Sequence, residues 1–267
     1  MVLERYSHGH HESVLRSHRW RTAENSAGFL LGHLQPDARV LDVGCGPGTI
    51  TVDLATRVPA GRVLGIDIVP EVLTRGRELA RERGVTNVDF VVGDVYDLDL
   101  DEASVDVVYV HQVLQHLREP VRALTELRRV LAPGGLLAVR ESDYGAFTWA
   151  PADPRLDAWL VAYHRLSARN GATADAGRVV HIWVRSAGFT DLEVTSSTWT
   201  YARPAERRWW GELWADRVTQ SAFATQCQEY GIATPADLER FATAFRAWSR
   251  DEAGCFHVPS VEVLARA

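Results

Sequence analysis

The 267-residue sequence contains no lysine, and all 29 of its basic residues are arginine. The absence of lysine excludes catalysis through a lysine Schiff base. Cysteine is also scarce: Cys45, Cys227 and Cys255 are scattered and form no Cys-x-x-Cys pair. This pattern indicates neither a disulfide framework nor a zinc site, and it favours a reduced, cytoplasmic protein. We therefore expect no metal ion.

The sequence also lacks long apolar runs and blocks of basic residues. No window approaches 18 consecutive apolar residues, so we expect no transmembrane helix, and the N-terminus lacks the apolar stretch of a signal peptide. The formal net charge is −6, and no basic face is available to neutralise the phosphates of a nucleic acid. The expected partner is a small molecule, and the choice between monomer and homodimer stays open.

Strand-like and helix-like segments alternate from residue 38 to residue 143. The strand-like segments are nearly continuous apolar runs, which is typical of strands buried on both faces of a parallel sheet. Helical apolar spacing separates them, and right-handed crossovers then produce a doubly wound α/β fold. The strands are expected at 38–44, 61–68, 87–94, 104–112 and 136–143, and the helices at 49–58, 70–84 and 118–135.

The alternation ends after residue 143. A loop and a helix are expected at 144–177, a helix that stops at Gly188, and two further strands at 190–201 and 255–267, the last as an edge strand. The resulting sheet is mostly parallel and seven-stranded. Residues 204–252 are predicted to be wholly helical and to form a lid inserted between the two late strands. The predicted division is an N-terminal helical cap at 1–37, a core at 38–203 and 253–267, and the lid at 204–252.

The stretch "VLDVGCGPGTI" (40–50) places a glycine-rich turn after the first strand, where α/β sheets bind ligands. Gly44, Gly46 and Gly48 permit positive φ and a close approach of the ligand to the backbone. A dinucleotide turn has the spacing G-x-G-x-x-G, whereas this turn has G-x-G-x-G and carries Asp42 before it. A carboxylate at that position would repel a pyrophosphate but accept hydrogen bonds from a cationic amino-acid group.

Residues 40–49 resemble the first motif of class I S-adenosylmethionine-dependent methyltransferases. The later motifs follow in order: "GIDI" ending the second strand, "GDVYDL" (93–98), "VDVVYVHQVLQHL" (105–117) and "RRVLAPGGLLAV" (128–139). The resemblance covers roughly 38–142 and the final strands. It implies a Rossmann-like fold, S-adenosylmethionine as the methyl donor and S-adenosylhomocysteine as the product.

The resemblance also implies roles for individual residues. Asp42 would stand near the methionine amino group through water, above a glycine turn that passes under the methionine part. Asp67 would accept from both ribose hydroxyls, and Asp94 from the adenine amino group. His111 and Gln112 would approach the sulfonium end through backbone carbonyls. The full set predicted to bind the cofactor is Trp20, Arg21, Asp42, Gly44, Cys45, Gly46, Gly48, Thr49, Asp67, Ile68, Val69, Gly93, Asp94, Val95, His111 and Gln112.

Residues 7–34 are similar to a segment of small-molecule methyltransferases related to quinone- and sterol-methylating enzymes. A like stretch, "SVLRSH-WRTAENSA", is found in fungal thiol methyltransferases, in which the N-terminal region covers the cofactor. The resemblance implies that Arg21 pairs with the cofactor carboxylate, although a surface cation on a helix is the alternative. The segment also holds His8, His10, His11 and His18. They lack the acidic or cysteine partners of a metal site, and one of them, His11, is a candidate base.

The methyl acceptor is less well defined. Base candidates near the strand ends are His116, His111, Glu141, Asp143 and Tyr144, and we retain His116, His11 and Tyr144 as catalytic candidates. The predicted lid is rich in tryptophan and phenylalanine, which favours a small, largely apolar acceptor. We prefer a thiol, with O- or C-methylation of an aromatic or quinone-like compound as the alternative. A catalytically inactive cofactor-binding regulator and an NAD-dependent oxidoreductase are alternatives of other classes.

Overall fold

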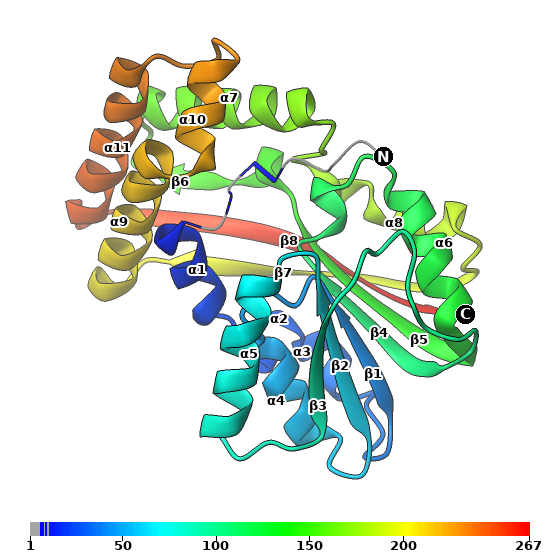
Figure 1. Ribbon diagram of the computed structural model, residues 1–267. Coiled ribbons are helices and arrows are strands. Elements are labelled where there is room, and N and C mark those ends of the chain that lie inside the picture. Colours follow the sequence, from blue (N-terminus) through cyan, green and yellow to red (C-terminus); the bar gives the residue numbers. More distant parts are fainter. Residues whose placement is uncertain (1–5, 8, 10) are drawn as a thin grey trace.

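The computed structural model describes residues 6–7, 9 and 11–267. Within them, one eight-stranded sheet has the order β3-β2-β1-β4-β5-β8-β6, and β7 pairs with the other side of β8 (Figure 1). Strands β1 to β5 are parallel, whereas β8 is antiparallel to β5, β6 and β7. The strands are β1 (Arg39–Val43), β2 (Arg62–Asp67), β3 (Val88–Val92), β4 (Val105–His111), β5 (Leu131–Ser142), β6 (Thr148–Ala150), β7 (Asp191–Tyr201) and β8 (Cys255–Arg266).

The helices begin and end at residues that suit those positions. Proline occupies the first turn of α5, α6, α7, α9 and α11, where its missing N–H has no intrahelical partner to lose. The helices are α1 (Glu12–Arg19), α2 (Ala23–Ser26), α3 (Gly28–Leu31), α4 (Thr49–Arg57), α5 (Pro70–Glu82), α6 (Pro120–Val130), α7 (Pro154–Asn170), α8 (Val180–Ser186), α9 (Pro204–Gln220), α10 (Ala222–Glu229) and α11 (Pro235–Arg250), with 3₁₀ turns at Leu114–His116, Tyr144–Ala146 and Ala176–Arg178.

Helices cover both faces of the parallel part of the sheet. Successive residues of a strand point to opposite faces. Accordingly, Val40 and Val107 pack with α2, α3 and α4 on one face, while Leu41 and Val108 pack with α6 and α8 on the other. Helix α5 packs beside α4 at the β3 edge. Burial on both faces explains why these strands are nearly continuous apolar runs.

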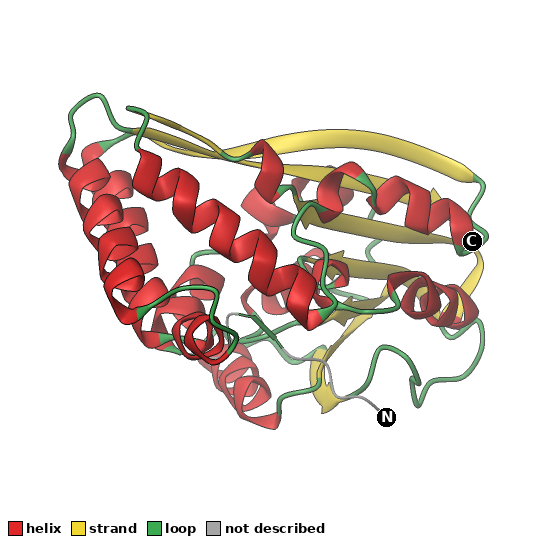
Figure 2. Ribbon diagram, turned by 90° about the horizontal axis from the view of Figure 1, so that it is seen from above, coloured by secondary structure: helices red, strands yellow, loops and turns green. Residues whose placement is uncertain are grey.

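A second apolar core lies at the other end of the long strands β7 and β8. Helices α7, α9, α10 and α11 pack there against β6 and the beginning of β8, and Figure 2 shows them as a separate helical layer. Its centre consists of fully buried rings, including Trp159, Trp214, Phe245 and Phe256. The sequence assigned residues 204–252 to the lid. The structure adds α7 to the same layer, because its apolar side faces the same ring cluster.

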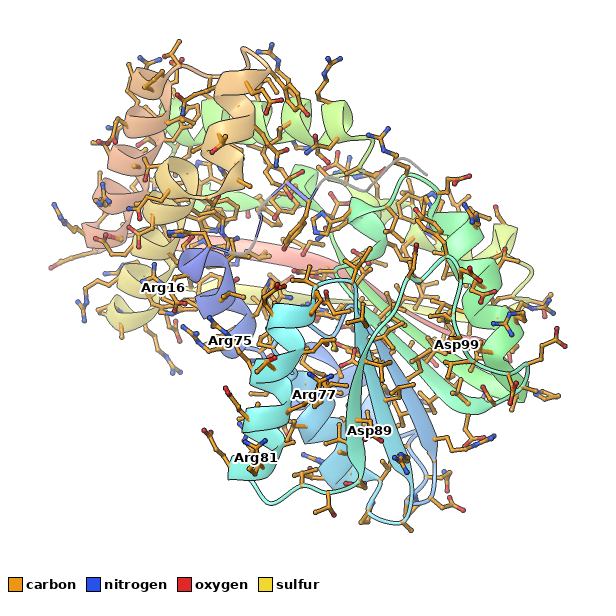
Figure 3. All side chains as sticks on the ribbon, in the orientation of Figure 1. Arg16, Arg75, Arg77, Arg81, Asp89 and Asp99 are labelled. Atoms are coloured by element: carbon orange, nitrogen blue, oxygen red, sulfur yellow. The ribbon has the colours of Figure 1, made fainter. Side chains whose placement is uncertain are left out.

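Helix α1 lies between the sheet and the helical layer, and ion pairs connect it to both sides. Arg16 pairs with Asp216 of α9, and Arg75 of α5 lies 3.9 Å from Glu12 of α1 (Figure 3). Arg217 of α9 also donates a hydrogen bond to the carbonyl of Ser13, at 3.2 Å. The N-terminal helix therefore joins the two parts of the molecule over the ends of the strands.

The predicted doubly wound, mostly parallel fold with helices between β7 and β8 is confirmed. Two details differ. Strand β8 was expected at the edge but lies between β5 and β7, because only its first half alternates and "VLA" at 263–265 is buried on both faces. Strand β6 was expected as a loop, since three residues are too short to show periodicity.

None of the described helices has the length and apolar character needed to cross a bilayer.

Candidate active site

A cavity of about 290 Å³ opens at the carboxyl ends of β1 to β4. We call it the main cavity. The turn after β1 and the ends of β2, β3 and β4 form its floor, and α1 together with Arg217 of α9 closes it from the opposite side. The carboxyl end of a doubly wound sheet is where such folds bind ligands. The volume suits a small organic molecule.

The glycine turn is shaped by close contacts as well as by positive φ. Gly44 has a φ of +65°, and a Cβ at this position would lie 2.4 Å from Cγ2 of Val113. Gly48 has a φ of +76°, and a Cβ there would lie 2.6 Å from the ring of Phe90, so this glycine serves helix packing and does not line the cavity. Helix α4 begins at Thr49. The turn therefore presents bare backbone to the cavity through Gly44 and Gly46.

Two carboxylates line the cavity at the ends of β2 and β3. Asp67 accepts hydrogen bonds from the backbone N–H of Gly46 (3.0 Å) and of Val69 (3.0 Å), one on each oxygen. Asp94 accepts one from the N–H of Tyr96 at 2.9 Å. A carboxylate oxygen has a second lone pair for a further donor. Both side chains are thus held in place by the backbone and retain the capacity to accept from ligand hydroxyl or amino groups.

Asp42 lies deeper, at the end of β1. It is 3% exposed and accepts a hydrogen bond of 2.6 Å from the hydroxyl of Thr51. Burial raises the pKa of Asp42 to about 7, against the smaller opposing effect of Thr51. A cationic group bound beside it would favour the carboxylate form, so Asp42 fits an ammonium ligand.

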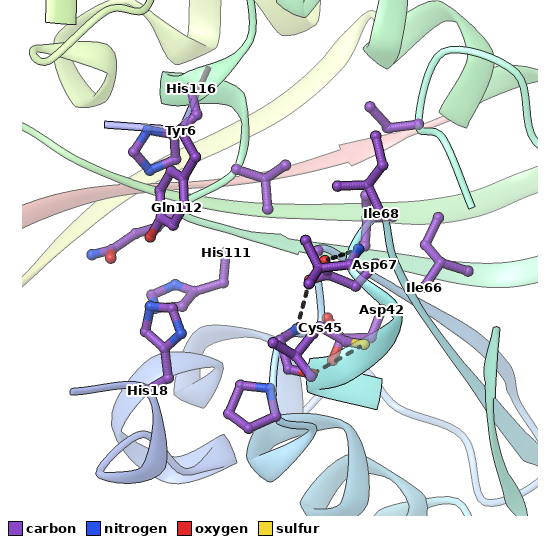
Figure 4. A pocket seen from close by; sticks show the side chains of 18 of the residues that line it. Tyr6, His18, Asp42, Cys45, Ile66, Asp67, Ile68, His111, Gln112 and His116 are labelled. Carbon is purple, nitrogen blue, oxygen red and sulfur yellow. Dashed lines mark hydrogen bonds between the residues drawn. The ribbon is translucent and has the colours of Figure 1, made fainter. Parts of the chain in front are cut away.

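Arginine and histidine gather at the opposite side of the cavity, where Figure 4 shows His18, His111 and Gln112 across from Asp67. The guanidinium of Arg21 donates to the amide oxygen of Gln112, whose backbone has an unusual φ of +54°. The imidazole of His111 is buried, and neither ring nitrogen has a partner within the described residues. Burial and the nearby Arg21 and Arg140 lower its pKa, so this imidazole is neutral.

The base candidates occupy different environments. His116 and Tyr144 line the main cavity, and burial lowers the pKa of His116 to about 3 and raises the pKa of Tyr144. Glu141 does not line the main cavity: its Oε1 accepts from the N–H of Leu114 at 2.7 Å and so holds the turn after β4. The carboxylate of Asp143 likewise accepts hydrogen bonds from the guanidinium of Arg178. Only His116, Tyr144 and His111 thus remain near a bound ligand.

A second, smaller cavity of about 30 Å³ adjoins the first, and we call it the aromatic cavity. Rings from β7, from α9, from the residue after α1 and from the 3₁₀ turn after β5 enclose it, and five of its residues also line the main cavity. The rings are Trp20, Tyr144, Phe147, Trp199, Tyr201, Trp209, Trp210 and Trp214, and the shared residues are Ser17, Arg21, Gln112, Tyr144 and Arg217. A ligand in the main cavity would therefore lie directly beside these aromatic rings.

Most residues that the sequence predicted at the site do line the main cavity, and three do not. Gly48 packs on Phe90, and Trp20 lines the aromatic cavity, where its ring is in contact with Trp199 at 5.2 Å between centroids. His11 caps α1 by accepting from the N–H of Ser13 and lines neither cavity, which argues against its role as a base. His8 and His10 lie outside the described residues.

Sequence reasoning missed several cavity residues, above all Tyr6, Ser17 and Arg217. A signal for Arg217 was present, because Trp210, Trp214 and Arg217 recur at i, i+4 and i+7 and so share one face of α9. Tyr6 stacks edge-on against His116, with 4.7 Å between ring centroids. Such a contact across 110 positions leaves no pattern in the sequence.

Comparisons with known proteins identify the class. The sequence profile of a family described as "Methyltransferase domain" matches residues 34–199, so the chain belongs to this family. It is 32% identical to an uncharacterized methyltransferase of Schizosaccharomyces pombe over 97% of this chain and 95% of that protein. It is 35% identical to a probable methyltransferase of Aspergillus luteorubrus over 62% of this chain and 61% of that one. The crystal structure of the Bacillus YcgJ protein superposes with a TM-score of 0.60 at 18% identity, covering 91% and 98% of the two chains.

The protein is a class I S-adenosylmethionine-dependent methyltransferase, and the main cavity fits this cofactor. Asp67 and Asp94 offer carboxylate oxygens for the ribose hydroxyls and the adenine amino group. Asp42 offers a buried carboxylate for the ammonium, and Arg21 a guanidinium for the carboxylate. Gly44 and Gly46 present bare backbone to the ligand, and a Cβ at Gly44 would collide with the side chain of Val113. The pairing of each residue with a group of the cofactor remains a prediction, and the side chains that line the main cavity support it.

The role of Arg21 can be measured directly. We expect Arg21→Gln to raise the Kd of S-adenosylhomocysteine about 10- to 100-fold, since a hydrogen bond to a charged group contributes about 1.5–3 kcal/mol. Isothermal titration calorimetry measures this change. Arg19→Gln is the control, because Arg19 ends α1 only two residues before Arg21 but pairs with Glu12 at the surface. An unchanged Kd in Arg21→Gln would contradict the assignment.

Proposed function

We propose that this enzyme transfers a methyl group to the thiol of a small, largely apolar acceptor, as in the S-methylation of a natural product. The observation that carries the proposal is the aromatic cavity, which adjoins the main cavity and shares Arg21, Gln112 and Arg217 with it. Aromatic walls favour an apolar or aromatic acceptor. The same reasoning gives 204–252 with α7 the role of a substrate-binding lid, and 1–37 that of a cap over the cofactor.

The protonation states near the two cavities support a thiol over an alcohol. His116 has a pKa of about 3, so it is neutral at physiological pH but is a weak base. The pKa of His111 is also lowered, and that of Tyr144 is raised. A thiol has an ordinary pKa of about 8.5 and is partly ionised at neutral pH without a strong base. An aliphatic alcohol would need a base that these residues do not provide.

When bound, S-adenosylmethionine supplies a methyl group attached to a positively charged sulfur. The residues of the chain align the cofactor with the acceptor and enclose both. The backbone at Gly44 and Gly46 and the carboxylate of Asp67 hold the cofactor, while the rings of Trp199, Tyr201 and Trp210 fix the acceptor on the other side. Exclusion of water by these rings suits a displacement in which charge is lost.

A matched acceptor panel tests the proposal. Purified enzyme is incubated with methyl-labelled S-adenosylmethionine and pairs of ring-substituted thiophenols and phenols, and the products are identified by mass spectrometry. We expect kcat/KM for each thiol to exceed that of its phenol by about 10-fold or more, given the greater nucleophilicity of the thiolate. Methylation of phenols, quinols or their ring carbons with no transfer to thiols would overturn the thiol assignment in favour of O- or C-methylation.

A further inference from the structure

Arg217 is a buried cation at the junction of the two cavities. It is 5% exposed, and it lines both the main and the aromatic cavity from the lid helix α9. Its Nη2 donates to the hydroxyl of Ser17 (2.8 Å) and to the carbonyl of Ser13 (3.2 Å), and the guanidinium lies 4.6 Å from the ring centre of Trp214. Its Nε has no partner within the described residues. The side chain is thus fixed in position, and part of its donor capacity is unused.

No carboxylate within the described residues neutralises Arg217. Its sequence neighbour Asp216 pairs with Arg16 of α1 and lies 3.8 Å from Arg246 of α11. The titratable groups that face Arg217 are the hydroxyls of Tyr6, Tyr144, Tyr163 and Tyr201 and the guanidinium of Arg21, and burial lowers the pKa of Arg217. A buried charge without a counter-charge is unfavourable. Such an arrangement is typical of a position where a ligand supplies the opposite charge.

Arg21 is a second guanidinium, partly buried, and within the described part of the chain it has no carboxylate partner. It donates to Gln112 of the turn after β4, and burial lowers its pKa to about 10, with smaller contributions from the positive charges of Arg140 and Arg217. Two unneutralised cations therefore border the same space. The carboxylate of the cofactor's methionine part would neutralise one of them, and we assign it to Arg21, which donates to Gln112 at the end of β4. The other cation, on the lid helix beside Trp210 and Trp214, faces the acceptor.

We propose that Arg217 binds the methyl acceptor as an anion, so that the reacting atom enters the transfer already deprotonated. The choice of a thiolate as that anion rests on the function proposed above. The need for an anionic acceptor rests on Arg217 alone. A neutral amine or an unactivated carbon would leave the buried charge without a partner.

The resulting step balances without a general base. The thiol proton passes to solvent as the acceptor binds, and the guanidinium stabilises the thiolate. The acceptor sulfur then forms a bond to the methyl carbon while the bond from that carbon to the sulfonium sulfur breaks, and its electron pair stays on the cofactor sulfur. The products are two neutral thioethers. Arg217 thereby replaces the base that His116 and His111 do not provide.

The pH dependence of kcat tests this role. We compare Arg217→Gln, Arg217→Lys and the control Arg207→Gln, since Arg207 is buried on the same helix but bonds the carbonyl of Ala202 away from both cavities. With a thiophenol whose solution pKa is near neutral, we expect Arg217→Gln to lower kcat about 10- to 100-fold below that pKa and about threefold or less well above it. Arg217→Lys should retain most of the activity at low pH, and Arg207→Gln should leave the profile unshifted.

Three outcomes overturn the inference. One is an equal loss of kcat at every pH in Arg217→Gln, which indicates a structural role. Another is a large rise in the Kd of S-adenosylhomocysteine, which indicates that Arg217 holds the cofactor. The third is transfer to a neutral acceptor that is unaffected by the substitution. If thiols are not methylated but phenols or carboxylic acids show the Arg217-dependent pH shift, the proposed thiol function fails while this inference stands.

A measurement on the unmodified enzyme covers the case in which Arg217→Gln does not fold. The same thiophenol is added to enzyme saturated with S-adenosylhomocysteine, at a pH one unit below its solution pKa, and the ultraviolet absorption band of the thiolate is recorded. We expect the bound thiophenol to be mostly thiolate, whereas the free compound at this pH is mostly thiol. A bound thiophenol with the absorption of the neutral thiol would overturn the inference.

Discussion

Replacing Asp67 by asparagine is expected to raise the Kd of S-adenosylhomocysteine about 100-fold. The carboxylate at the end of β2 already accepts from the N–H of Gly46 and of Val69, so both oxygens are fixed and each has one lone pair for a ribose hydroxyl. Asparagine has one acceptor oxygen, and its NH₂ group would face a backbone donor. The loss of one charged hydrogen bond and of one anchor of the turn corresponds to about 3 kcal/mol.

Calorimetric titration with S-adenosylhomocysteine measures the effect, and a neighbouring aspartate provides the control. Asp89 of β3 is half-exposed and pairs with Arg62 at the opposite end of the sheet from the cavity. Asp89→Asn should bind the cofactor product with an unchanged Kd. If Asp67→Asn bound it within about threefold of the parent, the ribose assignment would be wrong, since a charged hydrogen bond contributes more than that.

Replacing Asp42 by asparagine is expected to stabilise the ligand-free protein at pH 8. The pKa of Asp42 is raised to about 7 by burial, above its ordinary value of about 3.9. The folded state therefore retains a proton that the unfolded chain has lost between about pH 4 and pH 7. The contribution of Asp42 to the free energy of unfolding is therefore fully present below pH 4, and it is lost as the pH rises through 7. Above that the penalty is constant, at up to about 4 kcal/mol.

Urea unfolding at several pH values from 4 to 8 measures this difference. Asp42→Asn keeps an acceptor for Thr51 and cannot ionise, so its advantage over the parent in free energy of unfolding should be near zero at pH 4 and grow up to pH 7. Asp106→Asn is the matched control, because Arg39 lowers the pKa of Asp106 and removal of its charge should not stabilise the protein at pH 8. A difference between Asp42→Asn and the parent that does not change with pH would refute a buried, titrating Asp42.

The sequence alone determined the class of the protein and the floor of its main cavity. Strand ends in a parallel sheet are close in space whenever the strands are adjacent, so local signals at Asp42, the glycine turn, Asp67 and Asp94 were sufficient to predict a shared site. Each of these residues is placed by its own strand and the turn that follows it. The alternation of strands and helices likewise predicted the doubly wound fold, because the apolar spacing of a strand and that of a helix can both be recognised in short stretches of chain.

Only the tertiary structure decided what closes the cavity and what faces the acceptor. Arg217, Tyr6 and Ser17 come from α9 and the N-terminal segment, and they meet because α1 packs against α9, about 200 positions away along the chain. It also separated His11, which caps a helix, from His116, which lines the cavity, although both were equal candidates by residue type. Whether a histidine or an arginine caps, pairs or faces a ligand depends on its burial and its neighbours, and long-range packing determines both.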